Sequence, residues 1–149
     1  MQTERWSPYV TVFLRLALGT TFLAAVTDRF GFWGGPGGPN VSWGDFAHFL
    51  QYTAQVNAFL PHMLIPPVAW IATILETLLG FTLIVGLQTR LAALASGVLL
   101  LLFALAMTIS MGVKSALNYS VFSASAGAFW LAQSPLYPWT LDTLLHRGR

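Results

Sequence analysis

Hydrophobic side chains fall into four long stretches of the chain, and polar side chains collect between them. A run of about twenty predominantly apolar residues is long enough for a helix that crosses the hydrocarbon core of a bilayer. By this criterion the predicted spans are residues 9–27, 67–87, 91–111 and 117–133. The pattern therefore predicts an all-α integral membrane protein, a bundle of four transmembrane helices that forms a single domain over residues 1–149.

The second and fourth spans carry further local signals. Pro66 and Pro67 suit the first turn of a helix, so they mark the start of the second span. The fourth span is the least apolar of the four. Its polar side chains are Asn118, Ser120, Ser123 and Ser125. Its small residues, together with Ala93 and Gly97 in the third span, predict close packing within one bundle, with homodimerisation as the alternative.

The segment between the first two spans, residues 30–65, is too long to be a simple connector. It opens with a glycine- and proline-rich strip at residues 34–40, after which Ser42 and Asp45 have the spacing of a capping box. Over residues 43–60 the apolar side chains then recur at helical spacing. This predicts an amphipathic helix at the outer face of the membrane, which either lies on the lipid or, as we favour, covers the mouth of the bundle.

Composition supports the membrane class and removes several kinds of chemistry. Of the 149 residues, 56% are hydrophobic and 8% are charged, whereas a soluble domain has about 25% charged residues. The chain has no cysteine, which excludes disulfides, thiolate ligation of zinc or iron–sulfur clusters, and covalent c-type haem. It has neither a metal-ligand motif nor the basic cluster that nucleic-acid binding requires. We therefore expect a chain embedded in the lipid bilayer, with no bound metal and no nucleic-acid partner.

Basic residues near the ends of the spans indicate the orientation of the chain. Arg5, Arg90, Arg147 and Arg149 fall on one side of the predicted bundle, and Arg29 and Lys114 fall on the other. Because cytoplasmic loops carry an excess of lysine and arginine, both termini are predicted to be cytoplasmic. The expected location is the inner membrane of a bacterial cell, which the chain crosses several times.

Two charged side chains, Arg15 and Glu76, lie inside predicted spans and are the candidate catalytic residues. A charged residue at the centre of a span costs about 2.5–3.5 kcal/mol, so an ion pair between these two is the first hypothesis. One geometric fact opposes it, because side chains lean toward the N-terminus of their own helix and these two helices are antiparallel. Arg15 could instead reach the cytoplasmic interface, and Glu76 could be a protonated acid that handles protons or binds a ligand.

A second candidate site lies at the outer end of the first span. Asp28 and Arg29 form either a solvated interfacial anchor or a site in which Arg29 binds an anion or a quinone carbonyl. Three outer-side aromatic residues belong either to the interfacial belt or to the lining of a quinone pocket. They are Trp43, Phe46 and Trp70. His48 and His62 are also on the outer side, where we favour surface positions over axial ligation of a haem.

Three short motifs carry a resemblance to a known family. They are Arg15-Leu16-Ala17-Leu18-Gly19, Glu76-x-x-x-Gly80 and Gly86-x-x-Thr89-Arg90-Leu91-Ala92-Ala93. Over residues 15–133 the chain resembles the DoxX family of small four-helix bacterial membrane proteins, with Arg29 where members commonly have a lysine. The resemblance implies a cytoplasmic-membrane protein related to the DoxD subunit of a thiosulfate:quinone oxidoreductase, or a membrane partner of another redox enzyme.

These observations lead to three alternative functions. The first is a membrane component of a quinone-linked redox system, in which Arg15 and Glu76 form a polar site and the outer helix covers a quinone-sized pocket. The second is a non-enzymatic scaffold or assembly partner, in which the buried charges only fix the register of the helices. The third is a small-molecule transporter, for which four short spans leave little room. Because no residue pattern in the chain indicates an electron carrier, a redox role depends on a diffusible quinone or on a partner protein.

Overall fold

The computed structural model describes residues 7–146, and every regular element in that range is helical. In chain order the elements are α1 (Ser7–Arg29), α2 (Phe46–Val56), the short 3-10 helix η1 (His62–Leu64), α3 (Ile65–Val85), α4 (Thr89–Met111), α5 (Val113–Asn118), α6 (Val121–Ala132) and α7 (Leu141–His146). Three of the basic residues that indicated the orientation, Arg5, Arg147 and Arg149, lie outside the described residues. The described part of the chain is all-α, as the hydrophobic pattern predicted.

Within residues 7–146, three helical segments are long and apolar enough to cross a membrane. They are Pro8–Arg29, His62–Val85 and Thr89–Met111. Each coincides with one of the first three predicted spans, and Pro66 and Pro67 occupy the first turn of α3 as expected. The chain is therefore an integral membrane protein built on a helical bundle.

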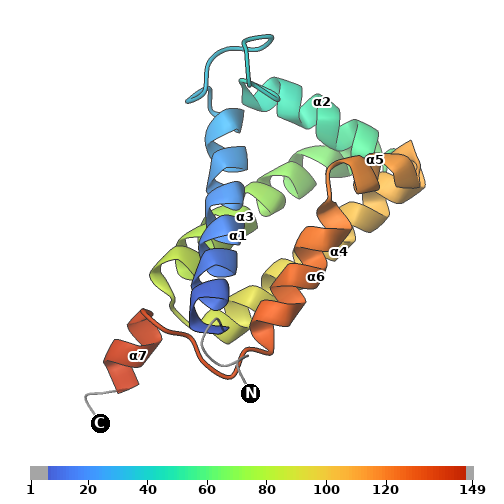
Figure 1. Cartoon of the computed structure of the whole chain (residues 1–149). Helices are drawn as coiled ribbons and strands as arrows, with labels where there is room; N and C mark the ends of the chain where they lie inside the picture. The colour runs from blue at the N-terminus through green and yellow to red at the C-terminus, as the bar shows by residue number, and fades with distance from the viewer. Residues whose placement is uncertain (1–6, 147–149) are drawn as a thin grey trace.

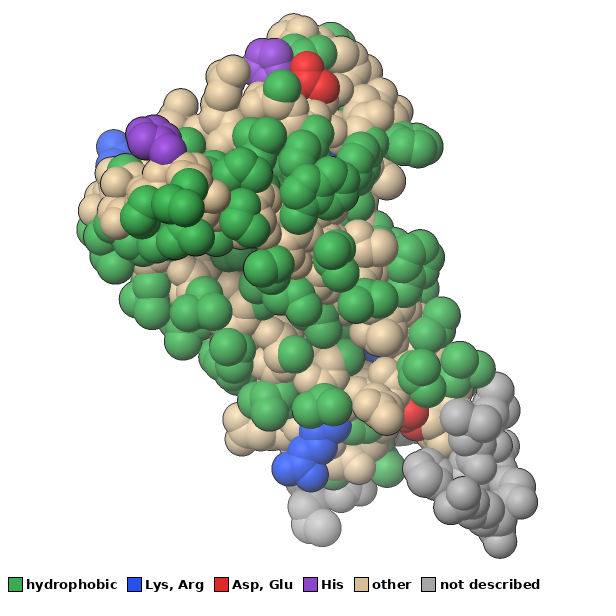
Figure 2. Space-filling model, turned by 180° about the vertical axis from the view of Figure 1, so that it is seen from behind, with side chains coloured by type: hydrophobic (Ala, Val, Ile, Leu, Met, Phe, Trp, Pro, Cys, Tyr) green, Lys and Arg blue, Asp and Glu red, His purple; other side chains and the backbone are tan. Residues whose placement is uncertain are grey.

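The exterior of the bundle is hydrophobic between its two ends. Figure 2 shows green hydrophobic side chains spread over the back of the molecule, with basic, acidic and histidine side chains mostly near the two ends. Large apolar side chains that are exposed on the long helices include Leu78, Phe81, Val98, Leu102 and Ile109. Continuous apolar exposure of this extent is typical of a surface that contacts lipid rather than water.

The predicted fourth span is wrong in its length. Instead of one helix over residues 117–133, the structure has α5, a break at Tyr119 and Ser120, and then α6. The chain turns at Ser120, which has a left-handed backbone with φ of 54°. The 12 residues of α6 make about 18 Å of helix, which is shorter than a hydrocarbon core of about 30 Å. The polar residues that weakened this span in the sequence include Asn118 and Ser120, which lie at the break.

Two closely packed helix pairs form the bundle. α4 packs on α6, where the Ser125 hydroxyl donates to the carbonyl oxygen of Gly97 at 2.8 Å and the Phe129 ring occupies the space that a side chain at Gly97 would need. α1 packs on α3, where Gly19 and Gly80 bring the two backbones together. The small residues of the third and fourth spans therefore serve packing within one chain, as predicted.

Helix α2 lies across one end of the bundle (Figure 1). We call this the loop end (residues 28–64) and the opposite end, near both termini, the terminal end (residues 86–90 and 134–146). α2 contacts α1, α3 and α4. Its buried side chains are Phe49, Thr53 and Val56, and its exposed polar side chains are His48, Gln51 and Gln55. The predicted amphipathic helix is confirmed, and it covers the bundle.

The start of α2 differs from the predicted capping box. Asp45, and not Ser42, is the N-cap, and its carboxylate accepts a hydrogen bond from the backbone N–H of His48 at 2.8 Å. The backbone N–H of Ser42 instead donates to Asp28 at 3.1 Å. α2 is shorter than the predicted range because the Asp45 cap begins it and Asn57, with non-helical dihedral angles, ends it.

We predict that Gly80→Ala lowers the stability of the protein by about 1–3 kcal/mol relative to Gly127→Ala. A Cβ at Gly80 would lie 2.8 Å from Leu23 Cδ2 and 3.1 Å from the carbonyl oxygen of Gly19, so α1 and α3 would have to separate. At Gly127 the nearest atom is Leu14 Cδ1, 3.3 Å away at the end of a flexible side chain. Both changes increase helix propensity by the same amount, so the difference between their melting temperatures in detergent measures the effect on α1–α3 packing. Equal melting temperatures would contradict the close crossing of these two helices.

Candidate functional site

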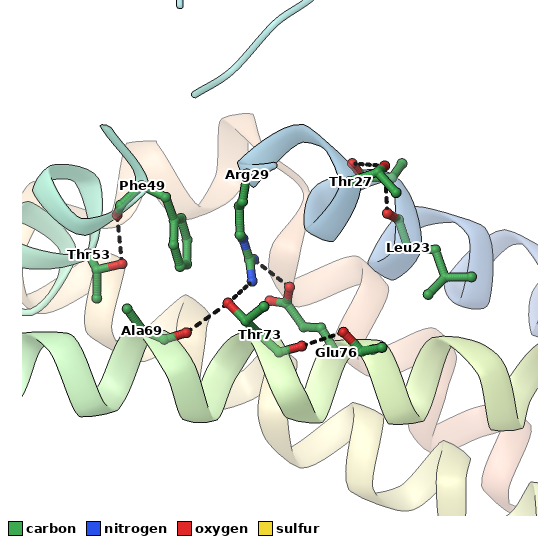
Figure 3. Close-up of polar contacts among 10 residues, drawn as sticks. Leu23, Thr27, Arg29, Phe49, Thr53, Ala69, Thr73 and Glu76 are labelled. Atoms are coloured by element: carbon green, nitrogen blue, oxygen red, sulfur yellow. Dashed lines mark hydrogen bonds and ion pairs between the residues drawn. The ribbon is translucent and has the colours of Figure 1, made fainter. Parts of the chain in front are cut away.

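A buried ion pair joins the end of α1 to the middle of α3. Arg29 Nη2 donates to Glu76 Oε2, and Arg29 Nη1 donates to Thr73 Oγ1 at 2.8 Å (Figure 3). Arg29 is only 2% exposed and Glu76 only 3% exposed. The Thr73 hydroxyl donates its own proton to the carbonyl oxygen of Ala69 at 2.8 Å, which leaves its oxygen free to accept from Arg29. α3 therefore presents two acceptors, one charged and one neutral, to a single guanidinium group.

The predicted pair between Arg15 and Glu76 is wrong, and the direction in which side chains lean explains why. Arg29 is the last residue of α1, so its side chain leans back along α1 into the bundle. Glu76 leans toward the N-terminus of α3, which is at the loop end. These two side chains converge, whereas Arg15 leans toward the terminal end. Glu76 has the arginine partner that a charge inside a span calls for, but from the other end of α1.

An aromatic ring from α2 covers the ion pair. Arg29 Cζ lies 3.8 Å from the centroid of the Phe49 ring and 5.4 Å from that of Trp43. A guanidinium at such distances is attracted by the electron-rich face of the ring, more strongly where water is excluded. Phe49 is buried, so its ring and the ion pair fill the space directly beneath α2. The quinone-sized pocket expected under the outer helix is therefore occupied by side chains of the protein.

Asp28 holds the segment that leads into α2. Its carboxylate accepts hydrogen bonds from the backbone N–H groups of Ser42, at 3.1 Å, and Trp43, at 2.8 Å. Asp28 is 6% exposed. The prediction of a solvated interfacial anchor is therefore wrong for both Asp28 and Arg29. Each lies inside the protein, and each fastens part of the loop to the bundle.

A second group of rings lies beside the ion pair. The ring centroids of Phe46 and Trp70 are 4.4 Å apart, and Phe30 packs on Phe46 at 5.9 Å. Trp70 remains exposed at the rim of this group. The structure thus brings Trp43 onto Arg29 and places Phe46 and Trp70 in a neighbouring aromatic cluster, formed with Phe30.

Both outer-side histidines lie away from the site. His48 is exposed on α2, with its ring Nδ1 2.8 Å from Asp45 Oδ1. The hydrogen bond from the backbone N–H of His48 lowers the pKa of the Asp45 carboxyl, which keeps this cap ionised. His62 is exposed in η1. His48 therefore belongs to the outward face of α2 and not to the group around Glu76.

Arg15 is buried at the terminal end, where main-chain oxygens hold it. Its Nη2 donates to the carbonyl oxygen of Trp139 at 2.9 Å, and its Nη1 donates to that of Pro138 at 3.2 Å. One turn earlier on α1, the hydroxyl of Thr11 lies 3.2 Å from that of Ser134. Arg15 thus fastens residues 134–140 to α1. These acceptors cannot be predicted from the sequence because a carbonyl group has no side-chain signature.

Asp142 performs a similar task for α4, and the sequence analysis missed it. Its carboxylate accepts hydrogen bonds from the backbone N–H groups of Gln88, at 2.7 Å, and Thr89, at 2.9 Å, and from the Thr89 hydroxyl at 3.1 Å. The segment packs closely, because a Cβ at Gly86 would lie within 2.6 Å of two side-chain carbons of Thr140. The side chain of Gln88, the N-cap of α4, makes no hydrogen bond to the first backbone N–H groups of the helix. These groups therefore need an acceptor from another part of the chain, and Asp142 supplies it.

The chemistry available at the loop end is charge pairing and hydrogen-bond donation. Within the described part of the chain, the Nε atoms of Arg29 and Arg15 are buried without a hydrogen-bond partner. Over the same residues, no group of three or more His, Asp or Glu side chains is placed to hold a metal ion. Both unpaired donors are therefore enclosed by the protein, Arg29 at the loop end and Arg15 at the terminal end.

We predict that Arg29→Met and Glu76→Met each destabilise the protein by about 3–5 kcal/mol, because each leaves the other charge buried without its partner. The double variant should lose less than the sum of the two, as coupled residues do. Thermal unfolding in detergent of the four proteins completes this cycle. The matched cycle of Arg15→Met with Glu76→Met should be additive. Coupling in the Arg15 cycle and additivity in the Arg29 cycle would contradict the assigned pair.

Comparison with known proteins identifies the family. Residues 7–118 match a family described as methylamine utilisation protein MauE. The match includes α1 to α5 and so contains the ion pair and its aromatic cover. It overturns the resemblance to the DoxX family, for which the comparisons give no support. Neither the characterised proteins nor the solved structures gave a match. Because the family match extends over most of its length, the chain belongs to the MauE family.

Proposed function

We propose that this chain is the membrane-embedded partner of a redox-enzyme system for the use of methylamine, and that the loop end is where the partner docks. Membership of the MauE family supports a role in methylamine use, because the family is described as methylamine utilisation protein MauE. Oxidation of an amine to an imine, followed by hydrolysis, releases its nitrogen as ammonia. The partner that we propose is therefore an oxidoreductase. The observation that carries the proposal is the way in which α2 is fastened.

Helix α2 is held from below by charges and presents a polar face on its other side. Arg29 pairs with Glu76 under the Phe49 ring, and Asp28 fixes the backbone that enters the helix. The opposite face carries the exposed polar side chains of His48, Gln51 and Gln55. A surface that is already ordered loses little conformational freedom when a partner binds, which favours affinity. This face is therefore suited to a protein that approaches from outside the bilayer.

The proposal leaves two routes for the electrons that the partner enzyme removes from its substrate. In one, electrons stay on cofactors of the partner, and this chain is a scaffold. In the other, a quinone ring stacks at the rim of the aromatic cluster of the loop end, on the exposed ring of Trp70.

We predict that a bacterium in which this chain supports growth on methylamine loses that growth when Gln51 and Gln55 are both changed to Arg. Two added charges on the exposed face of α2 should repel a docked protein while leaving its buried face intact. The measurements are growth on methylamine against ammonium, the amount of the protein in membranes, and the proteins that co-purify with it. Ile109→Leu, on the exposed side of α4, is the control.

Growth that withstands deletion of the whole chain would contradict the proposal. The same purified sample separates the two routes by lipid extraction. Bound quinone that is present in the unaltered protein and lost in Trp70→Ala supports the quinone route. A quinone-free sample that retains its partner supports the scaffold route.

We also propose that α5 and α6 together complete a fourth crossing, with both termini in the cytoplasm of a bacterial cell. The two helices return along α4 from the loop end to the terminal end, and close α4–α6 packing shields the short helix. A reporter enzyme fused after Arg149 should be active only in a cytoplasmic form, and one inserted at Gly37 only in an exported form. Activity on the same side for both fusions would contradict the four crossings, and exchanged sides would contradict the orientation.

A further inference from the structure

An open groove lies at the terminal end, away from the ion pair. Its volume is about 870 Å³, and it runs between the first turn of α4 and the segment of residues 135–143. Arg90 lies on one wall, with Leu91 beside it, and Leu136 and Tyr137 lie on the other. The groove thus combines a cation with apolar walls, and nothing in the site at the loop end accounts for it.

Arg90 has no counter-charge of its own in the described part of the chain. It is exposed, and its guanidinium makes no ion pair there. Asp142 also lines the groove, but its carboxylate accepts two backbone N–H groups and the Thr89 hydroxyl at the N-terminus of α4. The acid is therefore engaged with the helix, where its charge is favourable. Arg90 is the charged group in the groove that is available to a ligand.

The apolar walls of the groove are open to the surroundings. Leu91 is 60% exposed and Leu136 is 65% exposed. Arg90 is the second residue of α4, so it lies where a candidate membrane span begins and where lipid headgroups meet the hydrocarbon. A ligand that fits must carry an anionic group at that level and hydrocarbon chains next to it. An anionic phospholipid has both.

The wall opposite Arg90 is ordered before any ligand binds. The Tyr137 hydroxyl donates to the carbonyl oxygens of Leu131, at 3.0 Å, and Ala132, at 3.2 Å. Burial raises the pKa of the Tyr137 hydroxyl above its ordinary value. The hydroxyl therefore stays protonated at neutral pH and keeps the wall in place.

We propose that this groove binds the phosphate headgroup of an anionic phospholipid, with Arg90 donating to the phosphate and Leu91 and Leu136 contacting the acyl chains. The planar guanidinium offers two parallel N–H groups to phosphate oxygens, which an ammonium group cannot do. Basic recesses between helices at the edge of a membrane are suited to such headgroups. The site is independent of the proposed function at the loop end.

The test is lipid retention measured by native mass spectrometry of the full chain in detergent. Phosphatidylglycerol should bind the unaltered protein about fivefold more tightly than it binds Arg90→Gln, which is the factor for one arginine near a charged surface. Arg90→Lys should retain part of the difference. The matched control is Lys114→Gln, which removes an exposed cation from α5 and should bind as the unaltered protein does. Leu136→Glu, which adds a negative charge to the opposite wall, is a second variant that should weaken binding.

Three outcomes would overturn the proposal. The first is equal retention by Arg90→Gln and the unaltered protein, with Leu136→Glu also without effect. The second is binding of zwitterionic phosphatidylcholine as tight as that of phosphatidylglycerol, which would show a site for any lipid. The third is full displacement of the lipid by inorganic phosphate, which would show a site for the free anion.

Discussion

Arg29 and Glu76 lie where an unpaired charge would cost several kcal/mol, and the loop end is arranged around their pairing. The guanidinium needs acceptors, and α3 supplies them one turn apart as Thr73 and Glu76. Its flat face needs cover from water, and α2 supplies the Phe49 ring at 3.8 Å. One side chain at the end of α1 thus determines where α3 and α2 lie relative to it. Three helices that follow one another along the chain, α1, α2 and α3, meet at this point.

The terminal end follows the same physical rule with different partners. Arg15 is also buried in α1, 14 residues or about 21 Å before Arg29, but it donates to two carbonyl oxygens instead of a carboxylate. Asp28 and Asp142 likewise match each other, since each accepts two successive backbone N–H groups from a segment that precedes or begins a helix. Among the described residues, Arg15, Asp28, Arg29 and Asp142 thus each fasten a loop or the C-terminal segment to the bundle.

Most of the helices could be predicted from the sequence, but the side-chain contacts that hold them together could not. The first three spans follow from hydrophobic length, and the amphipathic α2 follows from helical periodicity, because both patterns are local. The partner of Glu76 depends on side-chain direction, which opposed Arg15 from the start but did not by itself point to Arg29. The carbonyl acceptors of Arg15 carry no side-chain signature, and the break at Ser120 depends on a backbone conformation that composition does not specify.

The short motifs that suggested another family have structural explanations in this chain. Gly80 allows α1 and α3 to cross closely, and Gly86 ends α3 in a left-handed conformation against Thr140. Thr89 receives the cap from Asp142. Close crossings and tight turns are needs of any compact helical membrane protein, so glycines at such spacings carry little information about ancestry. The match over residues 7–118 is the stronger evidence because it extends across whole helices.

A buried ion pair is weak evidence for stability, since apolar residues of equal volume often stabilise a protein as well or better. Unlike an apolar contact, the ion pair is directional, because the planar guanidinium group accepts few arrangements of its hydrogen-bond partners. At the loop end this directional geometry determines where α2 lies. The glycine- and proline-rich residues 34–40 form a non-helical connection between Arg29 and α2, so α2 does not take its position from a continuation of α1. Asp28, Arg29 and Glu76 fix α2 instead, so its polar face has a defined position, which the proposed docking of a partner requires.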